Sequence, residues 1–199
     1  MSDQSHDPSM HGTPSAWNLA NALTAVRIVL VPVFGWLLLY DGGADDGARV
    51  AAFVVFAVAM TTDRIDGDLA RKRGMVTDVG KIADPIADKA LTGMAFVGLS
   101  IVDELPWWVT LVVLAREWGI TLLRIAVIRR GIIPASRGGK VKTTLQAVAL
   151  GLYVLPLPAA FDPVEAVAMA LALIVTVVTG VDYVVSAVRR GSGGARDAS

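Results

Sequence analysis

The sequence predicts an all-α integral membrane protein with six transmembrane helices. Hydrophobic residues make up 54% of the 199 residues and charged residues only 18%, whereas water-soluble domains average about 45–50% and about 25%. Six continuous apolar stretches follow a polar start, and each is long enough to cross a hydrocarbon core of ~30 Å. Because these stretches are not alternating, helices are expected and barrel strands are not.

Two polar tails are expected to flank one domain of six helices. Residues 1–17 are polar and contain no Lys or Arg, so we expect a disordered cytosolic tail and no secretory signal. One six-helix domain is expected over residues 18–190, and a second disordered tail over the glycine- and serine-rich residues 191–199. The spans are expected at Leu19–Tyr40, Ala48–Ala70, Val79–Val102, Trp107–Ile128, Val141–Leu157 and Val164–Val188.

The charges in the connections predict an orientation. Lys and Arg cluster in the second and fourth connections and after the last span, whereas the odd connections are acidic, with Arg49 as the exception. Positive charge accumulates on the cytosolic side of membrane proteins. Both termini are therefore expected in the cytosol, and the protein in the cytoplasmic (inner) membrane.

The overall charge excludes several classes of function. Lys and Arg total 18, as do Asp and Glu, so the formal net charge is zero and no basic surplus is available for nucleic acid. The chain contains no cysteine, which excludes disulfides, thiolate metal sites and a cysteine nucleophile.

Four aspartates at the cytosolic ends of the second and third spans are the main functional signal. Asp63 and Asp66 are three residues apart, and Asp84 and Asp88 are four apart on the next helix. The short connection makes these helices antiparallel, so both pairs should lie at a similar depth. Four neighbouring carboxylates cannot all stay ionised without a cation. Mg²⁺ prefers such oxygen ligands, and two ions could clamp a phosphoryl group.

Small and basic residues accompany the aspartates. Gly67, Ala70 and Gly80 would let a phosphorylated ligand approach the helix backbone, and Arg71 offers a planar donor for phosphate. Charged helix ends can also be simple solvated flanks, and small residues can serve helix packing. A divalent-cation carrier is a further alternative, but acids at one edge and the lack of an internal repeat argue against it.

The acidic pattern resembles the signature of the CDP-alcohol phosphotransferases, membrane enzymes with six helices that displace CMP from a CDP-activated alcohol. The match reads Asp63-x2-Asp66-Gly67-x2-Ala70-Arg71-x8-Gly80-x3-Asp84-x3-Asp88. The resemblance implies two divalent ions, Mg²⁺ or Mn²⁺, bound by the four aspartates, with Asp88 also the base that activates the acceptor hydroxyl. It implies contacts with the CDP-lipid from the following residues: Asn21, Thr24, Gly67, Ala70, Arg71, Thr77 and Gly80.

Within this family the chain is most similar to the phosphatidylglycerophosphate synthases. Their Pro-Asn-x-Leu-Thr-x-x-Arg opening is matched from Asn21 to Arg27, with Ala20 in place of the proline. The resemblance implies CDP-diacylglycerol and sn-glycerol 3-phosphate as substrates, membrane lipid as surroundings and a homodimer. Cardiolipin synthase and phosphatidylinositol phosphate synthase remain the alternatives.

A cluster of basic residues favours an acceptor that carries a phosphate. Arg116 and Arg124 are eight residues apart on one face of the fourth span. A cationic pocket beside a metal site suits a phosphorylated acceptor, although cytosolic connections are rich in Lys and Arg in any case. The sequence assigns no role to Arg64, Asp68, Glu117 or Asp182. The expected acceptor-phosphate residues are Arg116, Arg124, Arg137, Lys140 and Lys142.

Overall fold

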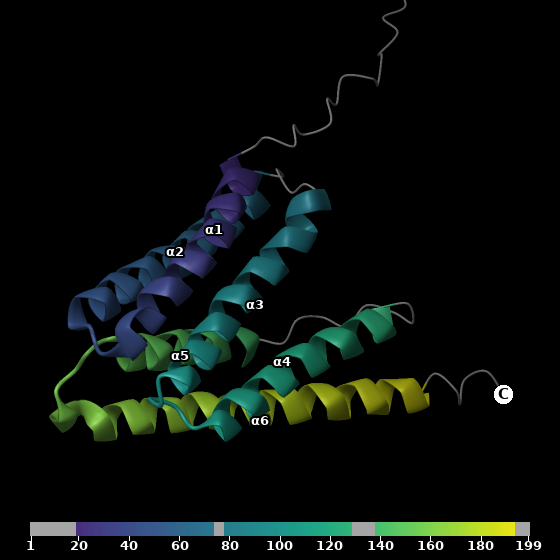
Figure 1. The fold of residues 1–199 in the computed structure, drawn as a ribbon. Coiled ribbons are helices and arrows are strands. Elements are labelled where there is room, and N and C mark those ends of the chain that lie inside the picture. The colour runs from purple at the N-terminus through teal and green to yellow at the C-terminus, as the bar shows by residue number, and fades with distance from the viewer. Residues whose placement is uncertain (1–18, 74–77, 129–137, 194–199) are drawn as a thin grey trace, which may run out of the picture.

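The computed structural model describes the backbone of residues 19–73, 78–128 and 138–193, and the side chains of residues 25–62, 89–123 and 141–186. Within these ranges the chain is helical, and no strand occurs in them. Short 3₁₀ turns, η1 (Tyr40–Gly43) and η2 (Ala159–Phe161), precede α2 and α6. The helices, drawn in Figure 1, are α1 (Leu19–Leu39), α2 (Asp46–Arg73), α3 (Asp78–Ile101), α4 (Trp107–Ile128), α5 (Gly138–Val154) and α6 (Asp162–Gly193).

The predicted helices are confirmed, and α4 has the predicted bounds. The helix α2 begins earlier than predicted because Asp45 caps it: the Ala48 N–H donates to Asp45 Oδ1 at 2.6 Å. The helix α6 continues to Gly193, into the segment predicted as a tail from residue 191. No proline stops the helix there, and glycine weakens a helix without ending it at once.

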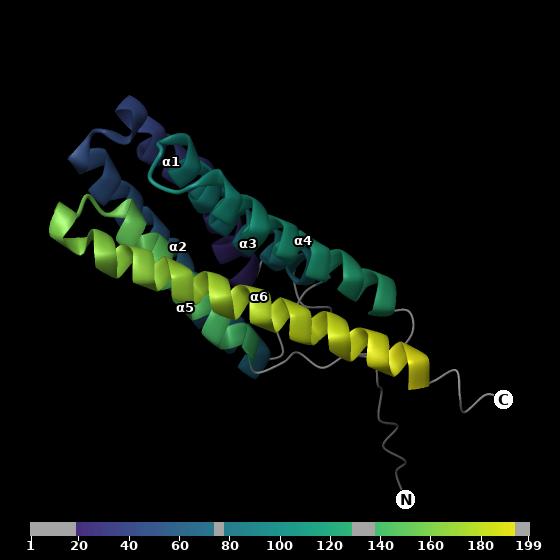
Figure 2. The ribbon, with the colours of Figure 1, turned by 90° about the horizontal axis from the view of Figure 1, so that it is seen from below.

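The six helices form one bundle in which the chain reverses direction from each helix to the next (Figures 1 and 2). The helix α1 packs against α2 and α3, α6 packs against α4 and α5, and α3 also contacts α2, α4 and α5. Figure 2 shows α4 and α6 side by side, with their C-terminal ends on the same side of the bundle. The central helix α3 therefore links the α1–α2 pair to α4, α5 and α6.

Apolar side chains fill the interior of the bundle. Phe34 of α1 and Phe56 of α2 are buried, with ring centroids 5.6 Å apart. A Cβ on Gly98 of α3 would lie 2.6 Å from Leu38 Cδ2, so this glycine permits α1 and α3 to approach closely. Other buried core residues are Leu91, Phe96, Leu99, Val113, Leu150 and Val154.

Large apolar side chains also cover the outside of the bundle. A water-soluble protein exposes such residues singly or in small patches, whereas here they follow the outer faces of α1, α2, α4 and α6. This surface suits a lipid solvent. Examples are Val29, Val33 and Trp36 on α1, Trp108, Leu111 and Leu122 on α4, and Val167, Leu171, Ile174 and Val178 on α6.

Two of the described segments pass the test of length and apolar composition for a membrane span, Ala25–Gly43 and Ala159–Ser186. Two shorter apolar segments are Lys89–Ile101 and Val141–Val154. The predicted all-helical class is confirmed by the described helices. The apolar segments are consistent with a membrane location.

Arg49, the basic residue that departs from the charge pattern, has a structural explanation. It is buried at the start of α2, where its Nε and Nη2 donate to the carbonyls of Val154 at 3.2 Å and Tyr153 at 2.6 Å. Its Nη1 forms an ion pair with Glu104 in the α3–α4 connection. Arg49 therefore satisfies the last carbonyls of α5 and ties three parts of the chain together.

Candidate active site

The two aspartate pairs lie on neighbouring helices. Asp63 and Asp66 belong to the C-terminal part of α2, and Asp84 and Asp88 belong to the N-terminal half of α3. The two helices contact one another. The side chains of residues 63–88 lie outside the described part of the chain, so metal ligation by these four aspartates stays a prediction.

The donor set agrees with the predicted metal. The two pairs are spaced three and four residues apart within continuous helices, and such spacings lie on one helix face. Carboxylate oxygens are the ligands that Mg²⁺ prefers. Among the described side chains, no group of three or more His, Asp or Glu could hold a metal ion.

Most other predicted site residues are placed only by their helix. Thr77 and Arg137 lie outside the described residues. The remainder have a described backbone, but their side chains are outside the described part: Asn21 and Thr24 in α1, Gly67, Ala70 and Arg71 in α2, Gly80 in α3, Arg124 in α4 and Lys140 in α5.

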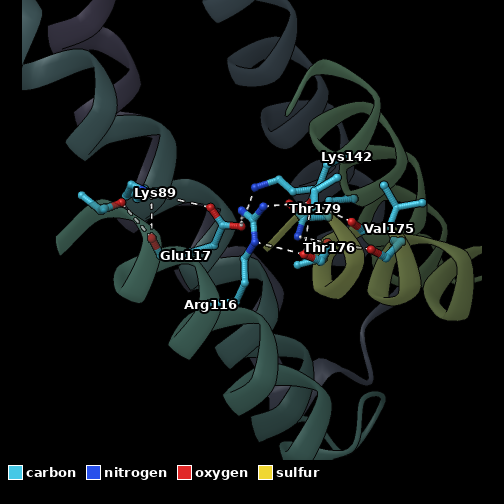
Figure 3. Close-up of polar contacts among 10 residues, drawn as sticks. Lys89, Arg116, Glu117, Lys142, Val175, Thr176 and Thr179 are labelled. Carbon is cyan, nitrogen blue, oxygen red and sulfur yellow. Dashed lines mark hydrogen bonds and ion pairs between the residues drawn. The ribbon is translucent and has the colours of Figure 1, made fainter. Parts of the chain in front are cut away.

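The described side chains beside the acidic motif form a cationic cluster, defined here as Lys89, Arg116, Glu117 and Lys142 (Figure 3). The carboxylate of Glu117 lies at its centre. Lys142 Nζ donates to Glu117 Oε1, Arg116 Nη1 lies 3.0 Å from the same oxygen, and Lys89 Nζ lies 3.6 Å from Oε2. Three cations thus surround one anion, and they come from three helices: α3, α4 and α5.

The cluster is half-buried. The side chain of Lys142 is 9% exposed, and those of Arg116, Glu117 and Lys89 are 16%, 17% and 20% exposed. Charges in such a position interact more strongly than on an open surface, because water screens them less. Lys89 Nζ also lies 3.4 Å from the carbonyl oxygen of Glu117. Lys89 directly follows Asp88 in α3, so the cluster and the acidic motif are neighbours in the sequence.

Arg116 is anchored on α6. Its Nε donates to the Thr176 carbonyl at 3.0 Å, and its Nη2 donates to Thr179 Oγ1 at 2.8 Å (Figure 3). Gly180 makes this position possible, since a Cβ there would lie 3.0 Å from Arg116 Cγ and 3.1 Å from Nε. The guanidinium of arginine has five N–H donors. The hydrogen bonds to Thr176 and Thr179 use two of them, so donors remain for a further anion.

A small cavity adjoins the cationic cluster. It has a volume of about 30 Å³ and is lined by Lys89, Glu117 and Lys142, together with Thr143 and Gln146 of α5. This volume holds about one water molecule, so a larger anion requires the side chains to separate. Gln146 Nε2 donates to Thr176 Oγ1 at 2.9 Å, which joins α5 to the α6 residues that hold Arg116.

An apolar groove of about 460 Å³ lies between α2 and α5. Thr61, at one end of the groove lining on α2, precedes Asp63 by two residues. Aromatic and aliphatic side chains dominate its walls, and such a lining suits a hydrocarbon chain. The lining residues are Phe53, Phe56, Ala57, Met60 and Thr61 from α2, and Thr144, Ala147, Val148, Gly151, Leu152 and Leu155 from α5.

Arg116 and Lys142 were predicted to share one pocket, and the structure brings both to the carboxylate of Glu117. Lys89 was not among the predicted site residues, and no role was predicted for Glu117. The signal for Lys89 was its position directly after Asp88, on the helix that carries the second aspartate pair. The signal for Glu117 was a lone acid inside an apolar run, since such residues usually have a partner or a function.

The fold and these residues agree with the family indicated by the sequence motif. The profile of the CDP-alcohol phosphatidyltransferase family matches residues 17–178. The chain belongs to this family of transferases. Members of the family are membrane proteins and generally use divalent metal ions.

Individual relatives narrow the similarity. The chain is 58% identical over 172 residues to the probable phosphatidylglycerophosphate synthase of Mycobacterium tuberculosis (strain ATCC 25618 / H37Rv), covering 86% of this chain and 82% of the relative. It is 36% identical over 180 residues to the CDP-diacylglycerol–glycerol-3-phosphate 3-phosphatidyltransferase of Bacillus subtilis (strain 168), covering 84% and 93%. The chain is also 36% identical over 121 residues to the CMP-forming cardiolipin synthase of Streptomyces coelicolor, but this match covers only 59% of this chain and 54% of the relative.

Proposed function

We propose that this protein transfers the phosphatidyl group of CDP-diacylglycerol to sn-glycerol 3-phosphate, giving phosphatidylglycerophosphate and CMP. The observation that carries the proposal is the cationic cluster around Glu117, one member of which, Lys89, directly follows Asp88 in α3. A cluster of three cations suits an acceptor that carries its own phosphate. The relatives that match most of the chain are named for this reaction.

The acidic motif would bind the reacting phosphates. Two divalent cations, Mg²⁺ or Mn²⁺, held by Asp63, Asp66, Asp84 and Asp88, would neutralise the pyrophosphate and the CMP leaving group. Asp88 would accept the proton of the acceptor hydroxyl. That oxygen then forms a bond to the phosphorus on the diacylglycerol side, and the bond from this phosphorus to the CMP oxygen breaks.

Other residues would hold the two substrates. The CDP part would be bound by residues from α1, α2 and α3 and their connection: Asn21, Thr24, Gly67, Ala70, Arg71, Thr77 and Gly80. The phosphate of the acceptor would be bound from α4, α5 and their connection: Arg116, Arg124, Arg137, Lys140 and Lys142. The family and the fold support these assignments, together with the ion pairs of Arg116 and Lys142.

The lipid part of the substrate would stay in the bilayer. The apolar groove between α2 and α5 lies next to Asp63 in the chain and has the volume and lining for an acyl chain. The exposed apolar faces of α1, α4 and α6 support six spans in the cytoplasmic membrane. The basic connections support a cytosolic active site and cytosolic termini, and part of an apolar face would be covered by a second copy in a homodimer.

A CMP-release assay tests the proposed function. Purified protein is incubated with CDP-diacylglycerol, Mg²⁺ and one acceptor at a time: sn-glycerol 3-phosphate, phosphatidylglycerol or inositol phosphate. We expect release with sn-glycerol 3-phosphate and none above background with the others. If CMP is released only with phosphatidylglycerol, or only with inositol phosphate, that compound is the acceptor and the proposed acceptor is wrong. Cation flux into liposomes that contain the protein and no nucleotide would instead indicate a carrier.

Changing the proposed base gives the sharpest test of the mechanism. In Asp88→Asn the amide cannot accept the hydroxyl proton, so turnover should fall by about 10³-fold or more, measured as CMP release. The matched control is Asp103→Asn, the same chemical change at an exposed residue of the α3–α4 connection. Asp103 has a φ of 59°, which asparagine tolerates, so this control should keep wild-type turnover. Near-normal activity of Asp88→Asn in extractable, folded protein would refute the base assignment.

A further inference from the structure

The proposed reaction does not involve the carboxylate of Glu117, which lies at the centre of the cationic cluster. Glu117 contacts Arg116 of its own helix, Lys89 of α3 and Lys142 of α5 (Figure 3). It does not neutralise them, because three positive charges face one negative charge. Among the described side chains the cluster therefore keeps a net charge of two positive units.

This surplus matches one class of anion. A phosphate monoester carries about two negative charges at pH 7 because its second pKa is near 6. A phosphodiester carries one negative charge, since it has no second acidic proton. The described cluster would be neutralised by a bound monoester but would keep one uncompensated positive charge beside a diester.

We infer that Glu117 is a positioning residue which gathers Lys89, Arg116 and Lys142 around its carboxylate and sets the charge of this cluster for a phosphate monoester dianion. The inference rests on the proposed function, in which the acceptor is such a monoester. Glu117 acts through the three cations and does not itself contact the phosphate. It is thus a specificity-determining residue for the acceptor.

The position of Glu117 explains why one carboxylate can hold three cations. Its Oε1 receives Lys142 and Arg116, while its Oε2 faces Lys89. Without the carboxylate, three like charges would share a half-buried pocket with little water to screen them. Lys142, whose side chain is 9% exposed, would then lose its ion-pair partner, and mutual repulsion would drive the two lysines apart.

The cluster still has donors for an incoming anion. A lysine ammonium has three N–H donors, and the hydrogen bond described for Lys142 uses one of them, to Glu117. The cavity beside the cluster holds about one water molecule. A phosphate is larger than this volume, so its entry would move the lysines apart by a small distance, while Arg116 stays fixed on Thr176 and Thr179.

Two substitutions test the inference in the full-length protein. Glu117→Gln keeps the shape of the side chain and removes its charge, whereas Glu117→Asp keeps the charge on a shorter stem. In Glu117→Gln, KM for sn-glycerol 3-phosphate should rise by about tenfold or more, while KM for CDP-diacylglycerol should change less than about twofold. Glu117→Asp should recover most of the loss. The matched control is Glu104→Gln, which removes a carboxylate from the Arg49 ion pair and should leave both KM values unchanged.

The choice of anion is tested on the wild-type protein, which makes the result independent of how the variants fold. Inorganic phosphate and its dimethyl diester are compared as inhibitors against sn-glycerol 3-phosphate. The dianion should inhibit at a concentration about tenfold or more below that of the diester. In folded Glu117→Gln, this preference should shrink. Equal inhibition by both probes in the wild type would overturn the inference.

The outcomes separate the inference from the proposed function. If the wild-type protein releases no CMP with sn-glycerol 3-phosphate, the proposed function fails and the inference with it. If the wild type uses this acceptor but Glu117→Gln keeps its KM and its preference for the dianion, the inference alone fails. A lower KM in Glu117→Gln also overturns it, because Glu117 would then compete with the phosphate and would not position the cations.

Discussion

Arg49 and Arg116 make similar contacts in two different parts of the bundle. Each guanidinium donates through Nε to a backbone carbonyl of another helix, Val154 for Arg49 and Thr176 for Arg116, and each forms an ion pair through Nη1. Each therefore ties its helix to a helix more than fifty residues further along the chain. Residue type and hydrogen-bond pattern alone do not distinguish the two sites.

The balance of charge does distinguish them. The described contacts of Arg49 pair one cation with the single carboxylate of Glu104 and with the carbonyls at the end of α5, where the helix dipole is negative. The Arg116 site adds Lys89 and Lys142 around the single carboxylate of Glu117. Acids outnumber the cation around Arg49, where Glu165 also interacts with Arg49 and Glu104, whereas cations outnumber the acid among the described side chains around Arg116. Half-buried charge requires compensation, and a bound anion would supply it at the second site.

Removing Arg49 should have the largest effect on stability. In Arg49→Ala the last carbonyls of α5 lose their donors and Glu104 loses its partner, so the free energy of unfolding should fall by about 3 kcal/mol. Unfolding in detergent, followed by circular dichroism against added SDS, measures the loss. Both KM values of the remaining folded protein should stay at the wild-type level. A selective rise in KM for the acceptor would remove the distinction between the two arginine sites.

Removing Arg116 should act mainly on substrate binding. In Arg116→Ala, KM for sn-glycerol 3-phosphate should rise by about tenfold, far more than KM for CDP-diacylglycerol, as measured by CMP release at varied concentrations of each substrate. Arg116→Lys keeps the positive charge but lacks the planar guanidinium that reaches both Thr176 and Thr179. Its KM for sn-glycerol 3-phosphate should therefore lie between those of the wild type and Arg116→Ala. An equal effect on both substrates would place Arg116 outside the acceptor pocket.

The sequence predicted the six helices well because continuous apolar runs separated by charged connections leave little choice of element. It also marked Arg49 as an exception, but the reason is a contact with the end of α5, about a hundred residues away. The role of Glu117 was hidden for the same reason, since Lys89 and Lys142 meet it only after three helices pack. The four aspartates lie close together in the sequence, so their motif could be recognised without the structure. The geometry of their side chains stays a prediction.

The smallest predicted effect is that of adding one methyl group at Gly180, where α6 contacts Arg116. In Gly180→Ala the new Cβ would lie 3.0 Å from Arg116 Cγ, so the arginine must shift by a few tenths of an ångström. KM for sn-glycerol 3-phosphate should rise by about two- to threefold. The gain in helix propensity from alanine, up to about 1 kcal/mol, is offset at this buried position by the close contact with Arg116.

Kinetics and unfolding of the same Gly180→Ala preparation measure both effects. The matched control is Gly119→Ala on α4, where a Cβ would meet no atom within 4 Å. It should add helix stability and leave both KM values unchanged. If Gly180→Ala also leaves KM unchanged, the hold of α6 on Arg116 serves packing alone, as the contacts of Arg49 do. A rise in KM for the acceptor alone, without a matching loss of stability, would instead show that α6 places Arg116 for the acceptor.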